Sequence, residues 1–139
     1  MAQSKIRVLL VDDHQMVREV IGRTLALQAD VEVVGSAGDA YEALALVRAV
    51  EPHVVLMDVD MPGLDGIAAT AALCAQTPSL RVVMLTATCP PRQVRAAFAA
   101  GACGYLLKEG TARELCDGVR TAVSGGRPVS AGVSPDVVP

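Results

Sequence analysis

The stretch VLLVDDH, residues 8–14, decides the fold and raises the question of function. Its four apolar residues fit a buried strand, and Asp12 and Asp13 follow at the point where that strand is expected to end. Carboxylates at the rim of an apolar core cost free energy unless something pairs with them. The two aspartates are therefore either solvated turn residues or groups that hold something in place.

The rest of the chain contains further strand-like segments that alternate with segments of helical pattern. Five apolar segments alternate with five stretches of helical period, and we expect strands at residues 6–11, 31–34, 53–58, 80–86 and 103–107. Strict alternation of strands and helices predicts a parallel sheet with helices on both faces. Five such units in 139 residues predict an α/β protein with the flavodoxin-like doubly wound fold and strand order 2-1-3-4-5.

Polar residues typical of helix starts precede three of the expected helices. Asp39 with Glu42, and Thr111 with Glu114, form capping-box patterns, and Asp65 is placed to cap a third helix. The last stretch, GGRPVSAGVSPDVVP, is rich in Gly, Pro and Ser and has no helical period. We therefore expect one domain over residues 1–125 and a flexible linker or tail over residues 126–139.

Composition narrows the classes of function. The net charge is −3 and no Lys/Arg cluster stands out, so this domain lacks the electrostatic pattern of a nucleic-acid binder. No apolar run approaches the roughly 20 residues of a membrane helix, and the start does not resemble a secretory signal, so a cytoplasmic protein is expected. No CxxC pair exists, and we expect four small, reduced, mostly buried cysteines: Cys74, Cys89, Cys103 and Cys116.

Polar residues follow four of the five expected strands. Asp12 and Asp13 follow the first strand and Asp58 the third, while Thr86 ends the fourth and Lys108 follows the fifth. In a doubly wound fold the carboxyl ends of the strands form the ligand-binding rim. The sequence therefore predicts that three carboxylates, one hydroxyl and one ammonium meet at a single rim.

The residue types at this rim indicate the chemistry. Oxygen ligands with no histidine or cysteine partner at ligand spacing favour a hard cation, and a few carboxylates with room for water suit Mg²⁺. The cation and Lys108 would offset repulsion among the acids and the charge of an incoming phosphoryl group. Asp58 is then the candidate nucleophile, because a carboxylate can form an acyl phosphate.

Four motifs, in this order and spacing, resemble the receiver domain of bacterial two-component response regulators: VLLVDDH, VVLMDVDMPGLDG, VVMLTA and GACGYLLKE. The resemblance covers residues 5 to about 125. It implies a signalling switch that accepts a phosphoryl group from a sensor histidine kinase. Such a domain is not an enzyme in the ordinary sense, although it takes part in phosphoryl transfer onto itself and is expected to dephosphorylate itself.

The resemblance implies a role for each acidic residue. Asp58 matches the aspartate that accepts the phosphoryl group. Asp12 and Asp13 match the acidic pair that binds Mg²⁺, with Asp13 as the more direct ligand. Asp60 matches the position whose backbone carbonyl completes the metal shell, so the implied metal site consists of Asp12, Asp13, Asp58 and Asp60.

The resemblance also implies how the switch works. Thr86 and Lys108 match the hydroxyl and the lysine that meet the phosphoryl group on Asp58. Tyr105 matches the aromatic residue whose rotation reports activation, since it can occupy the space that Thr86 vacates. The expected result is a population shift on the surface around the fourth helix, the fifth strand and the fifth helix.

The segments DDHQMVRE and GYLLKE are similar to the NarL/FixJ (LuxR-type) subfamily, whose members usually carry a C-terminal helix-turn-helix that binds DNA. No such output domain is expected within these 139 residues. The implied partners are a sensor histidine kinase, a second copy of the chain after phosphorylation, and DNA only through an output domain. No membrane partner is expected.

Other interpretations stay open. A stand-alone receiver would act by protein contact or phosphorelay without an output domain. The sequence Asp58-Val59-Asp60 resembles the DxD motif of haloacid-dehalogenase-type phosphatases, but here the acidic pair precedes the motif and no cap domain is present. A pseudo-receiver that never carries phosphate would usually lack one of the acids or the lysine, and all of them are present here.

Overall fold

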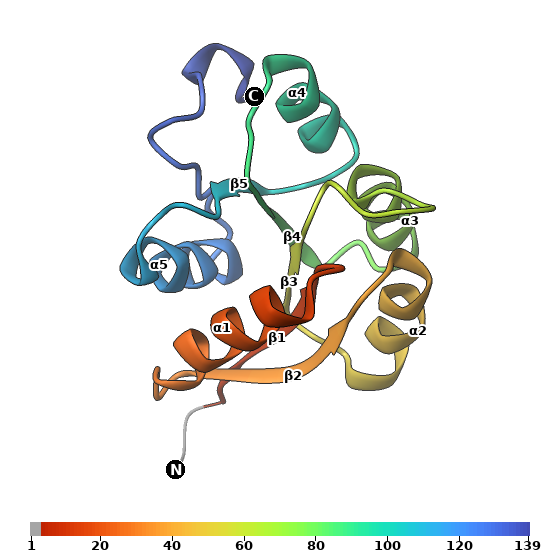
Figure 1. Cartoon of the computed structure of the whole chain (residues 1–139), viewed down its shortest axis with the longest axis vertical. Helices are drawn as coiled ribbons and strands as arrows, with labels where there is room; N and C mark the ends of the chain where they lie inside the picture. Colours follow the sequence, from red (N-terminus) through yellow and green to blue (C-terminus); the bar gives the residue numbers. More distant parts are fainter. Residues whose placement is uncertain (1–3) are drawn as a thin grey trace.

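The computed structural model describes residues 4–139. Its centre is a sheet of five parallel strands in the order β2-β1-β3-β4-β5, which confirms the predicted topology (Figure 1). The strands are β1 (Ile6–Val11), β2 (Val31–Ala37), β3 (Val54–Met57), β4 (Arg81–Thr86) and β5 (Gly104–Leu107). The helices are α1 (Gln15–Ala26), α2 (Ala40–Val50), α3 (Gly66–Gln76), α4 (Pro91–Ala99), α5 (Ala112–Val123) and a 3-10 turn, η1 (Pro135–Val137).

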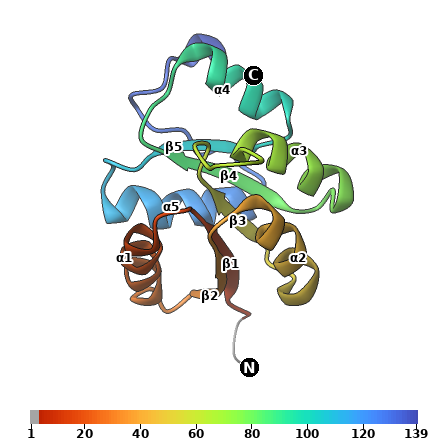
Figure 2. The same ribbon diagram turned by 45° about the vertical axis from the view of Figure 1, so that its right-hand side comes forward.

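Helices cover both faces of the sheet (Figure 2). Helices α1 and α5 lie on one face, and α2, α3 and α4 lie on the other, each layer enclosing its own cluster of buried apolar residues. All residues of the central strand β3 are buried, which explains why its sequence is continuously apolar instead of alternating. Within residues 4–139 no helix is both long enough and apolar enough to cross a membrane.

The residues predicted to cap helices make those contacts. The Asp39 side chain accepts a hydrogen bond of 2.8 Å from the backbone N–H of Glu42 at the start of α2. Asp65 and Thr111 accept the equivalent bonds at the starts of α3 and α5. Each bond satisfies an N–H that the first helical turn leaves without an intrahelical partner. The caps therefore fix where these helices begin and where the preceding loops end.

Strand β2 runs further than its sequence predicts. The apolar pattern ends at Val34, but pairing with β1 continues through Gly35 to Ala37. The register slips between Val8 and Leu9, so that Leu9 lies opposite Gly35. A Cβ at position 35 would lie 3.3 Å from the Leu9 side chain, so the absence of a side chain there eases the close approach of the two strands at this irregularity.

The segment after α5 is packed against the domain, although its composition predicts a flexible tail. Residues 128–138, which we call the strap, run along the open edge of β5 and end beside α4 (Figure 1). Val133 and Val137 in this segment are only 4% and 6% exposed. An edge strand offers unpaired backbone groups, and two valines four residues apart supply apolar contact, so the segment has physical reasons to dock. The division into a domain and a linker stays a prediction.

All four cysteines are free thiols. Cys103 and Cys116 are buried as expected, and Cys74 and Cys89 are half-buried. Cys89 lies in the loop before α4, where its Sγ is 3.5 Å from the carbonyl oxygen of Gly132 in the strap. Its thiol therefore contacts the strap and is not simply exposed in a loop.

Candidate functional site

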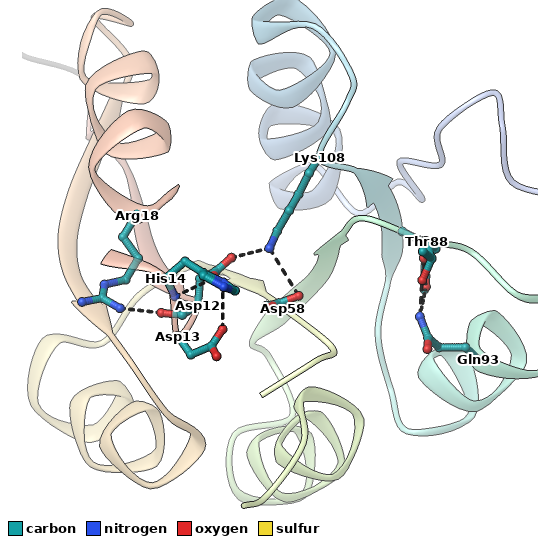
Figure 3. A network of polar contacts seen from close by, with 9 residues as sticks. Asp12, Asp13, His14, Arg18, Asp58, Thr88, Gln93 and Lys108 are labelled. Atoms are coloured by element: carbon teal, nitrogen blue, oxygen red, sulfur yellow. Dashed lines mark hydrogen bonds and ion pairs between the residues drawn. The ribbon is translucent and has the colours of Figure 1, made fainter. Parts of the chain in front are cut away.

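The predicted site residues gather at the carboxyl ends of the strands. Asp12 follows β1, Asp58 follows β3 and Lys108 follows β5, and Figure 3 shows the three side chains converging from these separate elements. The strands of a parallel sheet all end at one edge, so residues distant in sequence become neighbours there. The structure thus places these three residues together, as the sequence predicts.

Lys108 is the cation of this site. Its Nζ lies 2.6 Å from Oδ2 of Asp12 and 3.5 Å from Oδ1 of Asp58. Partial burial opposes the charged ammonium, but the hydrogen bond that Lys108 donates to Asp12 and the negative charges of both aspartates outweigh it and raise the pKa of Lys108. Lys108 is therefore protonated at neutral pH and offsets part of the negative charge around it.

Asp58 is a buried carboxylate whose charge is only partly compensated. The residue is 3% exposed. Burial, followed by the negative charge of Asp12, raises the pKa of Asp58, while Lys108 and the backbone N–H of Asp60 act in the opposite direction. The ionised carboxylate is consequently less stable here than in water. A second cation, or conversion of the carboxylate into another group, would relieve this cost.

Asp13 and His14 extend the acidic cluster toward solvent. Candidate ligand atoms of Asp12, Asp13, His14 and Asp58 all lie within 4.8 Å of one another. Nδ1 of His14 is 3.3 Å from Oδ1 of Asp12 and 3.1 Å from Oδ1 of Asp13. The expectation of a site with no histidine nearby is therefore wrong. The available signal was that His14 directly follows the acidic pair, which leaves its ring within reach of both carboxylates.

Two residues that the sequence analysis missed hold the backbone around the acids. The guanidinium of Arg18 on α1 donates to the backbone carbonyl of Asp12 at 2.5 Å. At the start of α3, a Cβ on Gly66 would lie only 1.9 Å from the backbone carbonyl oxygen of Asp58. A side chain at position 66 would displace the loop that carries Asp58. The glycine in the motif MPGLDG was the available signal.

Thr86 and Tyr105 are also buried, but they stand outside the ion-pair network. Thr86 is 0% exposed, and within residues 4–139 its hydroxyl has no hydrogen-bond partner. Its backbone carbonyl accepts the N–H of Lys108 at 2.9 Å, which ties the ends of β4 and β5 together. The Tyr105 hydroxyl donates to the carbonyl of Thr88 at 2.8 Å and accepts from Nε2 of Gln93 at 2.7 Å.

The residues at the rim fit a hard divalent cation together with a phosphoryl group. Carboxylate oxygens are the ligands that Mg²⁺ prefers, and a site with few protein ligands leaves room for its waters. Two observations favour such ligands: the incompletely compensated charge of Asp58, and the buried hydroxyl of Thr86 without a partner. The His14 side chain is 68% exposed, so it can turn away from the carboxylates when a cation binds.

Comparisons with known proteins agree with this geometry. The sequence model of the protein family described as the response regulator receiver domain matches residues 8–120. Over 120 residues the chain is 42% identical to the transcriptional regulatory protein LiaR of Bacillus subtilis, covering 86% of this chain and 57% of LiaR. The chain thus spans somewhat more than half the length of this relative.

Solved structures give the same result. The signal receiver domain of the putative response regulator NarL from Mycobacterium tuberculosis superposes with a TM-score of 0.85 at 39% identity, covering 88% of this chain and 99% of that one. The isolated REC domain of RcsB from Salmonella enterica serovar Typhimurium, determined with phosphomimetic BeF3−, gives a TM-score of 0.86 at 26% identity, covering 98% and 100%. The chain belongs to the family of response regulator receiver domains.

Proposed function

We propose that this chain is a phosphorylation-dependent switch of a two-component system, in which Asp58 accepts the phosphoryl group from a sensor histidine kinase. The observation that carries the proposal is the pairing of a buried, incompletely compensated Asp58 with Lys108, beside a cluster of further carboxylates. The site lies at the carboxyl ends of the strands, where the side chains of Asp13 and Lys108 are partly exposed and a phosphohistidine on another protein would approach. Family membership supports the same conclusion.

The transfer needs no proton from this chain. One Asp58 oxygen forms the new O–P bond while the N–P bond to the kinase histidine breaks, and the electron pair of that bond stays on the histidine nitrogen. Asp58 must be ionised to attack, and Lys108 favours its ionised form. The product is an acyl phosphate whose extra charge the ammonium of Lys108 can meet.

Mg²⁺ is the proposed cofactor. Asp12, Asp13, Asp58 and the backbone carbonyl of Asp60 would hold it, and the ion would neutralise charge that develops on the transferred phosphoryl oxygens. Thr86 would donate its hydroxyl to another phosphoryl oxygen, which gives that buried group the partner it lacks. Hydrolysis of the acyl phosphate in the same pocket would reset the switch.

The output is proposed to be control of transcription through a DNA-binding domain. LiaR is a transcriptional regulatory protein, and this chain spans 57% of its length. A second copy of the chain is the expected partner after phosphorylation, and the cytoplasm is the expected compartment. The change in side-chain position at Thr86 and Tyr105 would be transmitted to the DNA-binding domain through the surface of α4, β5 and α5.

The test is intact mass spectrometry after incubation with acetyl phosphate and Mg²⁺. We expect one phosphoryl adduct that disappears with a chelator and in Asp58→Asn, but persists in Asp117→Asn, which alters an exposed aspartate on α5. An adduct of equal yield in Asp58→Asn would refute the assignment of Asp58. A folded protein that forms no adduct with acetyl phosphate or with phosphorylated kinase would refute the proposed function.

A further inference from the structure

Tyr105 is completely buried although it lies on β5, the last strand of the sheet. Its hydroxyl is hydrogen-bonded to the Thr88 carbonyl in the loop before α4 and to the Gln93 amide on α4 itself. Gln93 Nε2 also lies 3.4 Å from the Thr88 carbonyl, and Figure 3 shows the amide directed at Thr88. Gln93 thus fastens the tyrosine and the loop to the same helix.

The strap holds the backbone of the same residue. The N–H of Tyr105 donates to the carbonyl of Pro128 at 2.9 Å, and the carbonyl of Tyr105 accepts the N–H of Ser130 at 3.0 Å. Ser130 Oγ further accepts the N–H of Leu107 at 2.9 Å. The strap therefore satisfies backbone groups that β5 would otherwise leave open at the edge of the sheet.

The strap also contributes apolar side chains to the core that contains Tyr105. Val133 and Val137 belong to the same buried cluster as Tyr105, and η1 packs beside α4. Figures 1 and 2 both place the C-terminal end of the chain next to α4. On an edge strand, a ring that leaves the core must move out past the edge of the sheet. The strap is paired with the backbone of β5 along that edge, which places it in the path of an outward turn of the ring.

We propose that Gln93 and the strap are positioning elements that hold Tyr105 in its buried place, so that strap docking and phosphorylation of Asp58 favour each other. The inference rests on the proposed function, in which Thr86 turns toward the phosphoryl group and Tyr105 fills the space it leaves. Anything that holds Tyr105 inward then favours the phosphorylated arrangement. Coupling of this kind is reciprocal, so phosphorylation must tighten the strap by the same factor.

The test labels the full chain with 3-fluorotyrosine and follows it by ¹⁹F NMR. The chain contains two tyrosines, and Tyr41 is 67% exposed, so Tyr41→Phe assigns the buried signal to Tyr105. Gln93→Met keeps the side-chain length but removes the amide donor. A double variant, Val133→Ser with Val137→Ser, weakens the strap.

The matched controls are Gln76→Met and Val123→Ser, which alter exposed residues at the ends of α3 and α5. In Gln93→Met we expect the exposed Tyr105 population to rise, and the affinity for beryllofluoride with Mg²⁺ to fall, by about three- to tenfold, the range for one buried hydrogen bond. The strap variant, which loses apolar contacts, should change both quantities in the same directions. Conversely, beryllofluoride should slow amide hydrogen exchange at Ser130 by a similar factor. The controls should match the unmodified chain.

The ¹⁹F signal without any ligand decides the positioning role. If Tyr105 stays fully buried in both Gln93→Met and the strap variant, the proposal is overturned. If Tyr105 moves outward but the beryllofluoride affinity of both variants equals that of the unmodified chain, the coupling is overturned. Failure of the proposed function is recognised separately, because beryllofluoride would then bind the unmodified chain no better than it binds Asp58→Asn.

Discussion

Replacing Thr86 by valine should stabilise the unphosphorylated protein and weaken the switch. The hydroxyl of Thr86 is completely buried without a partner in the described residues, and valine has nearly the same shape. Leaving a buried hydroxyl unsatisfied costs about 1–3 kcal/mol, and a methyl group in its place adds apolar burial. We therefore expect Thr86→Val to raise the free energy of unfolding by about 1–2 kcal/mol.

Thermal unfolding followed by circular dichroism measures this effect. In a domain of this size 1 kcal/mol corresponds to roughly 3–5 °C in Tm. The matched control is Thr70→Val, because Thr70 is equally buried but its hydroxyl donates to the carbonyl of Gly66 at 2.7 Å. Removing that bond should lower stability by about 0.5–1.5 kcal/mol. The two substitutions, chemically identical, should thus have opposite signs.

The second half of the experiment adds Mg²⁺ and beryllofluoride. Binding to the folded state raises Tm, and at a given ligand concentration tighter binding raises it more. The rise should be smaller in Thr86→Val, which has no hydroxyl to donate to the bound anion, than in Thr70→Val. The reasoning fails if Thr86→Val loses as much stability as Thr70→Val, because the hydroxyl must then already have a partner. It also fails if beryllofluoride stabilises both variants equally.

Three further predictions follow from the same site. Because the pKa of Asp58 is raised, its ionised form destabilises the folded state, and Asp58→Asn should unfold at a higher urea concentration than the unmodified chain at pH 7 without Mg²⁺. The difference in urea midpoint should shrink as the pH falls through the Asp58 pKa, and a difference that stays constant would contradict the raised pKa. Asp13→Ala should weaken Mg²⁺ binding roughly tenfold or more in calorimetric titration and slow phosphorylation, whereas unchanged affinity would mean that Asp13 is only a turn residue. Gly66→Ala should lower stability by about 1–3 kcal/mol and reduce phosphorylation, because its Cβ would lie 1.9 Å from the Asp58 carbonyl oxygen. The control Gly22→Ala, whose Cβ would lie 3.7 Å from its nearest neighbour, should raise stability by about 0.5–1 kcal/mol. Equal effects of the two substitutions in urea titrations would argue against the close approach at Gly66.

The strand order and the position of the rim could be predicted because they depend on patterns that local sequence carries. A continuous apolar run such as that of β3 is compatible with burial on both faces, and alternation with helices then leaves little freedom in topology. Once the strands are placed, Asp12, Asp58 and Lys108 must meet, since parallel strands end at one edge. This part of the site follows from topology more than from side-chain detail.

The docked strap and Gln93 could not be predicted because they depend on tertiary contacts without a local pattern. The strap docks through backbone groups of Pro128 and Ser130, which any sequence carries, and through two valines among turn-forming residues. His14 differs from these, because it directly follows the acidic pair and its contact with Asp13 is local in sequence. Gln93 reaches Tyr105 only because the tertiary fold brings the first turn of α4 close to the Tyr105 hydroxyl, a relation that periodicity within α4 does not encode.

The features that make this site reactive also make it unstable, and this connects structure to switching. The ionised Asp58 and the hydroxyl of Thr86, which has no partner within residues 4–139, both destabilise the folded state in the absence of a ligand. In the proposed function, a phosphoryl group with Mg²⁺ would relieve both at once, since it would remove the bare carboxylate and give the hydroxyl an acceptor. A ligand shifts a conformational equilibrium only by its difference in affinity between the two states. The shared relief of two buried polar groups would supply such a difference. Tyr105 is placed to carry it further, because its hydroxyl is bonded to α4 and its backbone is bonded to the strap.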